Sequence, residues 1–174
     1  MGEELILKQP TKEDEFQVMQ FRQEFIDAGE VICGGGGLDD ATEYKQWLDK
    51  VEKYKNIETL PQNRVPTTQF LTIRKSDNKI VGIISVRHYL NENLLVHGGH
   101  IGDSVLPSER KKGYATKQIQ LALNYCKSLG IEKVLMSCTV DNIASEKSIV
   151  KNGGVLENQI ECDGKIYKRF WIKL

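Results

Sequence analysis

One short segment of the chain combines three consecutive cations with a glycine and a small residue, namely Arg110, Lys111, Lys112, Gly113 and Ala115. Residues 101–106 before it have the apolar pattern of a strand, and residues 114–129 after it that of an amphipathic helix. The first N–H groups of a helix have no intrahelical partner and carry partial positive charge, so such a turn readily binds phosphate. Cations at this end of a helix oppose its dipole, which indicates a compensating anion. The segment therefore predicts a site for a phosphate or a pyrophosphate.

A run of four glycines at residues 34–37 is a second candidate for phosphate binding. A nucleotide P-loop ends in Gly-Lys-Ser or Gly-Lys-Thr, whereas here Gly37 is followed by Leu38 and Asp39. The dinucleotide fingerprint G-x-G-x-x-G after the first strand is also absent. Consecutive glycines cost too much backbone entropy for the interior of a helix or strand. We therefore interpret residues 29–37 as a mobile connection between two helices, which could flank an acceptor pocket.

The elements that position these residues follow from hydrophobic periodicity and turn signals. In chain order we predict a strand at 5–7, a helix from a capping pair at Thr11 and Asp14 to about 28, a second helix capped by Asp39 or Asp40, strands at 69–73 and 79–86, a loop near 91–93, a strand at 101–106, the helix 114–129, a strand at 133–139, a short helix from Asp141, and strands at 154–162 and 166–173. Residues 76–78 and the pair Asp163-Gly164 predict hairpin turns. This order predicts one mixed α/β domain over residues 1–174.

Composition and charge exclude several classes of partner. The chain has 174 residues, 40% of them hydrophobic and 28% charged, as in ordinary globular proteins. Lys+Arg and Asp+Glu balance at 24 each, which argues against a nucleic acid or a membrane surface as the partner. The cations at residues 110–112 are therefore a local feature, which favours a small anionic ligand.

The cysteines and the N-terminal residues indicate a protein of a reducing compartment. The cysteine spacing also gives no sign of a bound metal. Cys33, Cys126, Cys138 and Cys162 are widely spaced and form no CxxC pair, so the sequence predicts no metal site. The first residues are acidic and lack the apolar core of a signal peptide, and no apolar run reaches membrane-spanning length. We therefore expect a cytoplasmic protein.

Residues 110–115, Arg-Lys-Lys-Gly-Tyr-Ala, fit the [Q/R]-x-x-G-x-[G/A] acetyl-CoA signature, so the chain resembles the GNAT acyltransferase superfamily. Residues 141–145 after a strand are similar to the family's second CoA-contacting segment, and residues 151–154 resemble its usual K-x-G-F ending. The resemblance extends over essentially the whole chain. It implies an α/β fold with a central mixed sheet of about seven strands and four helices, in which the fourth and fifth strands splay around acetyl-CoA.

The resemblance also assigns roles to individual residues, with acetyl-CoA as co-substrate. The pyrophosphate would be cradled by Arg110, Lys111, Lys112, Gly113, Tyr114, Ala115 and Thr116. The backbone of Asp103, Ser104 and Val105 would pair with the pantetheine arm like an added strand, and the Asp103 amide would polarise the thioester carbonyl. Asn142 and Ser145 would contact the cofactor from the opposite side.

The chain departs from the family pattern at two positions. Many members place a tyrosine seven residues after the position of Asn142, as general acid for the leaving thiolate, but Ile149 stands here and cannot donate a proton. Gly154 replaces the phenylalanine of the K-x-G-F ending. Tyr114 and Tyr125 are poor substitutes, which we interpret as structural residues.

A histidine is the best candidate for a general base, because its side chain titrates near neutrality. His100 lies on the strand before the turn, and His97 and Glu30 are weaker candidates. A structural, hydrogen-bonded His100 is an equally good reading.

The sequence therefore predicts transfer of an acetyl group from acetyl-CoA to a small-molecule or peptide amine, by direct attack in a ternary complex. We expect the acceptor pocket between residues 29–40, the second helix and residues 88–100. A hydroxyl acceptor, a non-catalytic CoA-binding module and a small nucleotide-binding protein are the alternatives. The C-terminal strands could pair across a homodimer.

Overall fold

A computed structural model describes residues 3–174. Its strands and helices are β1 (Leu5–Lys8), α1 (Glu15–Asp27), α2 (Tyr44–Lys55), β2 (Thr67–Arg74), β3 (Lys79–Arg87), α3 (Glu92–Val96), β4 (Ile101–Val105), α4 (Tyr114–Ser128), β5 (Lys133–Thr139), α5 (Ile143–Lys151), β6 (Val155–Cys162) and β7 (Lys165–Lys173). Short 3-10 turns precede α1 and follow α2 and β4.

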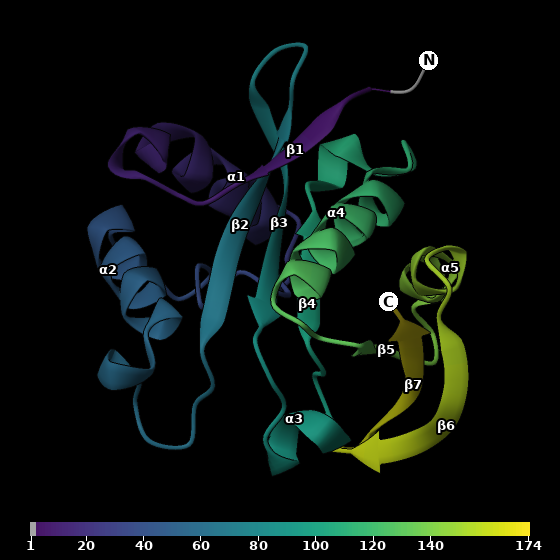
Figure 1. Ribbon diagram of the computed structural model, residues 1–174. Coiled ribbons are helices and arrows are strands. Elements are labelled where there is room, and N and C mark those ends of the chain that lie inside the picture. The colour runs from purple at the N-terminus through teal and green to yellow at the C-terminus, as the bar shows by residue number, and fades with distance from the viewer. Residues whose placement is uncertain (1–2) are drawn as a thin grey trace.

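The seven strands form two hydrogen-bonded sheets that meet between β4 and β5 (Figure 1). The first has the strand order β1-β2-β3-β4 and the second the order β5-β7-β6, and all neighbouring strands within them are antiparallel. Within residues 3–174 no strand ladder joins β4 to β5. The predicted mixed α/β fold with seven strands is therefore confirmed, and the interruption lies where the splay was expected.

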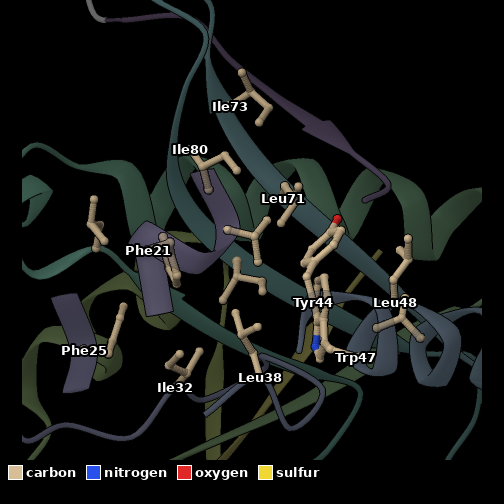
Figure 2. Close-up of a cluster of buried hydrophobic side chains, with 14 residues drawn as sticks. Phe21, Phe25, Ile32, Leu38, Tyr44, Trp47, Leu48, Leu71, Ile73 and Ile80 are labelled. Atoms are coloured by element: carbon tan, nitrogen blue, oxygen red, sulfur yellow. The ribbon is translucent and has the colours of Figure 1, made fainter. Parts of the chain in front are cut away.

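Helices α1 and α2 cover one face of the first sheet (Figure 1). The stripe Tyr44, Trp47, Leu48 and Val51 has the i, i+3, i+4, i+7 spacing of one helical face, and all four side chains are buried. Figure 2 shows Tyr44 and Trp47 packed side by side against side chains of the sheet. The two helices thus bury part of this face of the sheet, and the glycine loop (residues 29–40) approaches it near β4.

Helix α4 covers the opposite face and spans both sheets. Its inward residues include Ala122 and Cys126, which are fully buried and small enough to let the helix lie close to the strands. The same cluster of buried residues contains Ile84 of the first sheet and Met136 and Phe170 of the second. One hydrophobic core therefore holds the two sheets together where backbone pairing does not.

Two predicted boundaries need correction. Helix α2 begins at Tyr44 rather than after Asp39 or Asp40, because Asp39 accepts a hydrogen bond from the Ile32 amide at 3.2 Å and so closes the preceding loop. The predicted loop near residues 91–93 contains the short helix α3, whose first turn is capped by the side chain of Asn91. The structure thus adds a fifth helix to the four expected.

The glycine loop is anchored, contrary to the mobile connection that we expected. Gln69 donates to the carbonyl of Gly34 at 2.8 Å, and the Trp47 indole donates to that of Gly35 at 2.8 Å. Arg22 donates to two further carbonyls at the end of the loop. A Cβ on Gly34 would overlap the backbone carbonyl of Gly102 in β4. The loop therefore lies directly against β4, and only glycine permits that approach.

We predict that Gly34→Ala destabilises the fold more than Gly29→Ala does. Both glycines have positive φ, +70° and +65°, so each alanine costs about 1 kcal/mol in backbone strain. Only the Gly34 variant adds a clash with β4, which we expect to cost about 2 kcal/mol more. Urea denaturation of the two variants measures the difference, and equal losses of unfolding free energy would contradict the close approach.

Candidate functional site

The N-terminus of α4 presents unpaired backbone N–H groups. Gly113 is the N-cap residue, with φ of 80°, and offers no side chain to cap the helix. The first helical bond runs from the Lys117 N–H to the Gly113 carbonyl at 3.2 Å. Within residues 3–174, the N–H groups of Tyr114, Ala115 and Thr116 therefore have no protein acceptor. Such a helix end binds anions through its N–H groups and its dipole.

The cations of this turn are mostly paired, which corrects the charge argument made from the sequence. Arg110 forms a two-pronged ion pair with Glu30 at 2.9 and 2.6 Å. Lys112 contacts Glu109 at 2.6 Å. Across residues 3–174, Lys111 has no ion pair. Carboxylates of the chain itself thus offset two of the three cations, and the unpaired N–H groups remain as the stronger evidence for an anion site.

Glu109 organises the turn as the centre of a charge cluster. Its carboxylate contacts Arg74 at 2.7 Å and Lys79 at 2.7 Å, in addition to Lys112. Burial tends to raise the pKa of Glu109, but hydrogen bonds from the three cations hold it at about 2. The carboxylate is therefore charged at any working pH and ties the turn to β2 and β3.

The edge of β4 that faces β5 has no strand partner within residues 3–174, although the Val105 carbonyl accepts a hydrogen bond from Arg110 Nε at 3.3 Å. Adjacent residues of an antiparallel strand point their N–H and C=O groups to opposite sides. Arg87 donates to the His100 carbonyl at 2.8 Å, and Leu106 donates to the Val81 carbonyl at 2.9 Å. Together with the pairing register of β3 and β4, these bonds show that the backbone N–H and C=O groups of Gly102 and Ser104 point toward β3. The residues that direct their backbone groups to the open edge are Ile101, Asp103 and Val105.

Ser104 does not fit the role predicted for it. It pairs with Ile83, so its backbone groups face β3 rather than the open edge. Its hydroxyl donates to the Cys33 carbonyl at 2.8 Å and so helps to anchor the glycine loop. Of the three residues expected to pair with the pantetheine arm, only Asp103 and Val105 are oriented for it.

The Asp103 carboxyl makes buried contacts that the sequence did not predict; from the sequence, its charge is only a faint hint, with Glu30, Asp39 and Asp40, of a cationic amine acceptor. Its oxygen accepts a hydrogen bond from Gln118 at 2.8 Å, and Gln118 in turn accepts from Thr72 at 2.8 Å. Burial raises the pKa of Asp103 to about 6, against the opposing effect of the Gln118 hydrogen bond. A carboxyl between the apolar residues Ile101 and Val105 was the available signal, but the sequence alone did not place Gln118 of α4 within hydrogen-bond reach of it.

His100 joins the two sheets at the point where they diverge. The backbone N–H of His100 donates to the Leu135 carbonyl at 2.8 Å, and the ring Nδ1 of His100 accepts from the backbone N–H of Leu135 at 3.0 Å. Burial, together with the charge of Arg87, lowers the pKa of His100 to about 4. The ring is therefore neutral near pH 7, and its Nδ1 already accepts the hydrogen bond from Leu135. These contacts support the structural reading of His100 and disfavour the predicted role as a base.

The weaker base candidates are also engaged. His97 stacks edge-to-face on Tyr167 with ring centres 4.2 Å apart. The Glu30 carboxylate is held by Arg110, whose hydrogen bonds lower the pKa of Glu30.

Asn142 and Ser145 begin helix α5, where the Asn142 side chain accepts from the Ser145 N–H at 3.1 Å. At the other end of α5, Asn152 donates to the Thr116 carbonyl at 3.1 Å, which ties this helix to the first turn of α4. Ile149 between them is fully buried in the core. The positions predicted to contact the cofactor thus lie along one helix, but their contact with it remains a prediction.

Neither tyrosine considered as a substitute acid is free. The Tyr114 hydroxyl accepts from Arg74 at 3.2 Å, and the Tyr125 hydroxyl lies 3.0 Å from the Thr68 hydroxyl. Both have the structural contacts that we expected.

A cavity of about 380 Å³ opens beside the glycine loop, where the acceptor pocket was predicted. Its walls come from residues 32–37, from α2, from residues 63–69, from the end of β3 and from the start of α3. This volume is in the range of small-molecule sites.

The described residues contain no cluster of three or more His, Cys, Asp or Glu side chains that could hold a metal ion. No helix of residues 3–174 has the length and apolar character needed to cross a membrane.

Residues 4–155 match the family described as "Acetyltransferase (GNAT) domain". The chain belongs to this GNAT acetyltransferase family. A search of curated proteins found no match.

Solved GNAT structures resemble the chain over nearly its full length. RimJ from Mycobacterium smegmatis, in complex with CoA-disulfide, has a TM-score of 0.72 at 15% identity and covers 97% of this chain and 81% of its own. The spermidine/spermine N-acetyltransferase SpeG from Vibrio cholerae has a TM-score of 0.66 at 17% identity, covering 97% and 93%. A GNAT-family acetyltransferase from Bacillus anthracis has 0.66 at 19%, covering 99% and 96%. At these identities the likeness establishes the fold.

We predict that Asp103 makes this GNAT fold less stable as pH rises. The folded pKa of about 6 exceeds the ordinary value of 3.8, so the folded state binds the proton more tightly than the unfolded state. Stability from this group is full below about pH 4 and is lost as pH rises through 6, by up to about 3 kcal/mol. Urea denaturation from pH 4 to 7 should show this loss in the parent relative to Asp103→Asn. Parallel pH curves for the two proteins would contradict it.

Proposed function

We propose that the chain transfers the acetyl group of acetyl-CoA to an amine by direct attack in a ternary complex. The observation that carries this proposal is the uncapped N-terminus of α4 beside the open edge of β4. A pyrophosphate suits the first, and an extended chain with amide groups suits the second. Acetyl-CoA has both parts, and membership of the GNAT family implies it as co-substrate.

The N–H groups of Gly113, Tyr114, Ala115 and Thr116 would hold the pyrophosphate, with Lys111 nearby as the cation that forms no ion pair within residues 3–174. Arg110 and Lys112 keep carboxylate partners, so we assign them mainly to the rigidity of the turn. Asp103 and Val105 would pair their backbone groups with the amides of the pantetheine arm. The bound cofactor supplies a thioester whose carbonyl carbon accepts a nucleophile.

The backbone amide of Asp103 is our candidate for stabilising the charge that develops on the carbonyl oxygen. Its direction toward the open edge, which follows from the pairing with β3, supports this role.

The acceptor must attack as a neutral amine. An amine of pKa ~10.4 requires about 4.6 kcal/mol to be neutral at pH 7, so a proton acceptor helps. His100, His97 and Glu30 are engaged in other contacts. The Asp103 carboxyl bonds to Gln118 of α4, on the face of β4 opposite the glycine loop, so we assign the role of proton acceptor to solvent water. A thiol pKa of about 8.5 allows the sulfur to leave with little assistance, so Ile149 in place of a tyrosine does not preclude turnover.

A non-catalytic CoA-binding module is the alternative, and the buried Ile149 motivates it. The two functions differ in whether acetyl-CoA is consumed when amines are supplied. The acceptor named for SpeG is not carried over, because 17% identity supports only the fold.

We predict that Gly113→Glu weakens acetyl-CoA binding by about tenfold or more, because it places an anion at the proposed pyrophosphate site. Gly130→Glu is a matched control at the C-terminal end of the same helix. The two glycines have φ of +80° and +77°, and a Cβ at either position would meet no atom within 4 Å. Backbone strain is thus similar in both variants, and only the location of the charge differs. Calorimetry that finds the same Kd for both variants would overturn the placement of the cofactor.

For His100→Ala we predict a loss of about 1–3 kcal/mol in stability, because the Leu135 N–H loses its buried acceptor. The rate-versus-pH profile, measured well below the melting temperature, should keep its shape. His97→Ala serves as the control for removing a ring from the same region. Disappearance of an ionisation from the profile of His100→Ala would restore His100 as the base.

A further inference from the structure

The cavity beside the glycine loop is lined by three cations and by no carboxylate. Lys50 comes from α2, Arg64 from the segment before β2, and Arg87 from the end of β3. None of them belongs to an ion pair of residues 3–174. This is unexpected in a chain with 24 acidic and 24 basic residues, and it contrasts with the α4 turn, where carboxylates meet two of three cations.

Arg87 is fixed in the wall of the cavity, where its charge and that of Arg64 repel each other. The Arg87 Nη1 donates to the carbonyls of Gly98 and Gly99 at 3.1 and 3.0 Å, which fixes the guanidinium, and within residues 3–174 its other nitrogens have no protein acceptor. Burial, and then the positive charge of Arg64, lower the pKa of Arg87. Both side chains line the same cavity, and an anion bound there would offset their mutual repulsion.

Lys50 approaches the cavity from the opposite wall. Its Nζ lies 5.8 Å from the centre of the Tyr54 ring. A Cβ on Gly37 would come within 2.6 Å of this Nζ, so glycine at that position leaves space for the ammonium group. The glycine loop thus directs a cation toward the cavity, although no phosphate-binding motif is present.

The cavity adjoins the proposed site of reaction. Ser85, which lines it, pairs with Gly102 in β4, and Gly34 from the opposite wall touches the same residue. Gly102 directly precedes Asp103, whose amide we assign to the carbonyl oxygen. A molecule anchored in the cavity could therefore extend a second group toward this edge of β4.

We propose that the cavity binds the anionic group of the acceptor, which is a small amine that also carries a carboxylate or a phosphoryl group. This rests on the proposed acetyl transfer. The amine nitrogen bonds to the acyl carbon and the C–S bond breaks with its electron pair leaving on sulfur. The proton that the amine loses passes to solvent, from which the CoA thiolate is protonated. Polyamines are poor acceptors, because the cations of the cavity repel them and no carboxylate there attracts them.

Matched amines test the proposal. The panel consists of 4-aminobutyrate against putrescine, β-alanine against β-alaninamide, phosphoethanolamine, spermidine and an acidic pentapeptide. We expect kcat/KM for the carboxylated or phosphorylated small amines to exceed that of their uncharged or cationic counterparts by about tenfold or more. Comparison of 4-aminobutyrate with phosphoethanolamine distinguishes the two anionic groups. A preference for spermidine, putrescine or the pentapeptide would overturn the assignment.

Substitution of the cavity cations tests whether they bind the anionic group of the acceptor. Lys50→Gln and Arg64→Gln should each raise KM for the preferred anionic amine by about tenfold, with kcat and the Kd for acetyl-CoA unchanged. Lys53→Gln, on α2 but outside the cavity, is the matched control and should behave as the parent. A parent-like KM for Lys50→Gln and Arg64→Gln would overturn the anion site.

Calorimetric titration of the amines into CoA-saturated protein separates this inference from the proposed function. If anionic amines bind, and bind more weakly to Lys50→Gln, but no acetyl group is transferred, the anion site stands and the enzymatic proposal fails. If acetyl-CoA is consumed but anionic amines bind no better than putrescine, the enzymatic proposal stands and the anion site fails.

Discussion

Two hydrogen bonds between His100 and Leu135 join the sheets at the point from which β4 and β5 diverge. The imidazole ring takes the place of a backbone acceptor, and a Cβ on Gly99 would overlap the Leu135 carbonyl, so a close joint requires both residues. Beyond this joint, the described residues give β4 no strand partner on that side. The shared core under α4 packs against both sheets and holds them together there. An open strand edge is normally a liability, and here it provides the hydrogen-bonding groups for an extended ligand.

The cations of the turn before α4 mostly have carboxylate partners, whereas those of the cavity do not. At the turn before α4, Glu30 and Glu109 neutralise two of three cations, so the anion-binding capacity lies mainly in backbone N–H groups. Among the described residues that line the cavity, Lys50, Arg64 and Arg87 are charged and none is a carboxylate. Backbone groups suit a ligand part that every member of a CoA-using family shares. Side chains suit the part that differs between acceptors, because they can change without altering the fold.

Much of the architecture could be predicted from local patterns. Period-two and period-3.6 apolar spacing placed all seven strands and four helices, and Asp163-Gly164 marked the last hairpin, where both residues have positive φ. The start of α2 was wrong because Asp39 is a good capping residue, yet its carboxylate serves the Ile32 amide across the loop. Helix α3 was missed because it is only five residues long and has no complete apolar stripe.

The sequence by itself determined the family, the order of elements and the turn at residues 110–116, because these depend on local spacing along the chain. Only the tertiary structure decided which charges remain unpaired. Arg110 meets Glu30 across 80 positions, and the pKa of Asp103 is raised by burial in the folded chain, against the hydrogen bond from Gln118. The three cations of the cavity come from three separate segments of the chain, and they indicate an anion site only because the fold brings them together. Electrostatic environment depends on distances in space, which spacing in sequence does not specify.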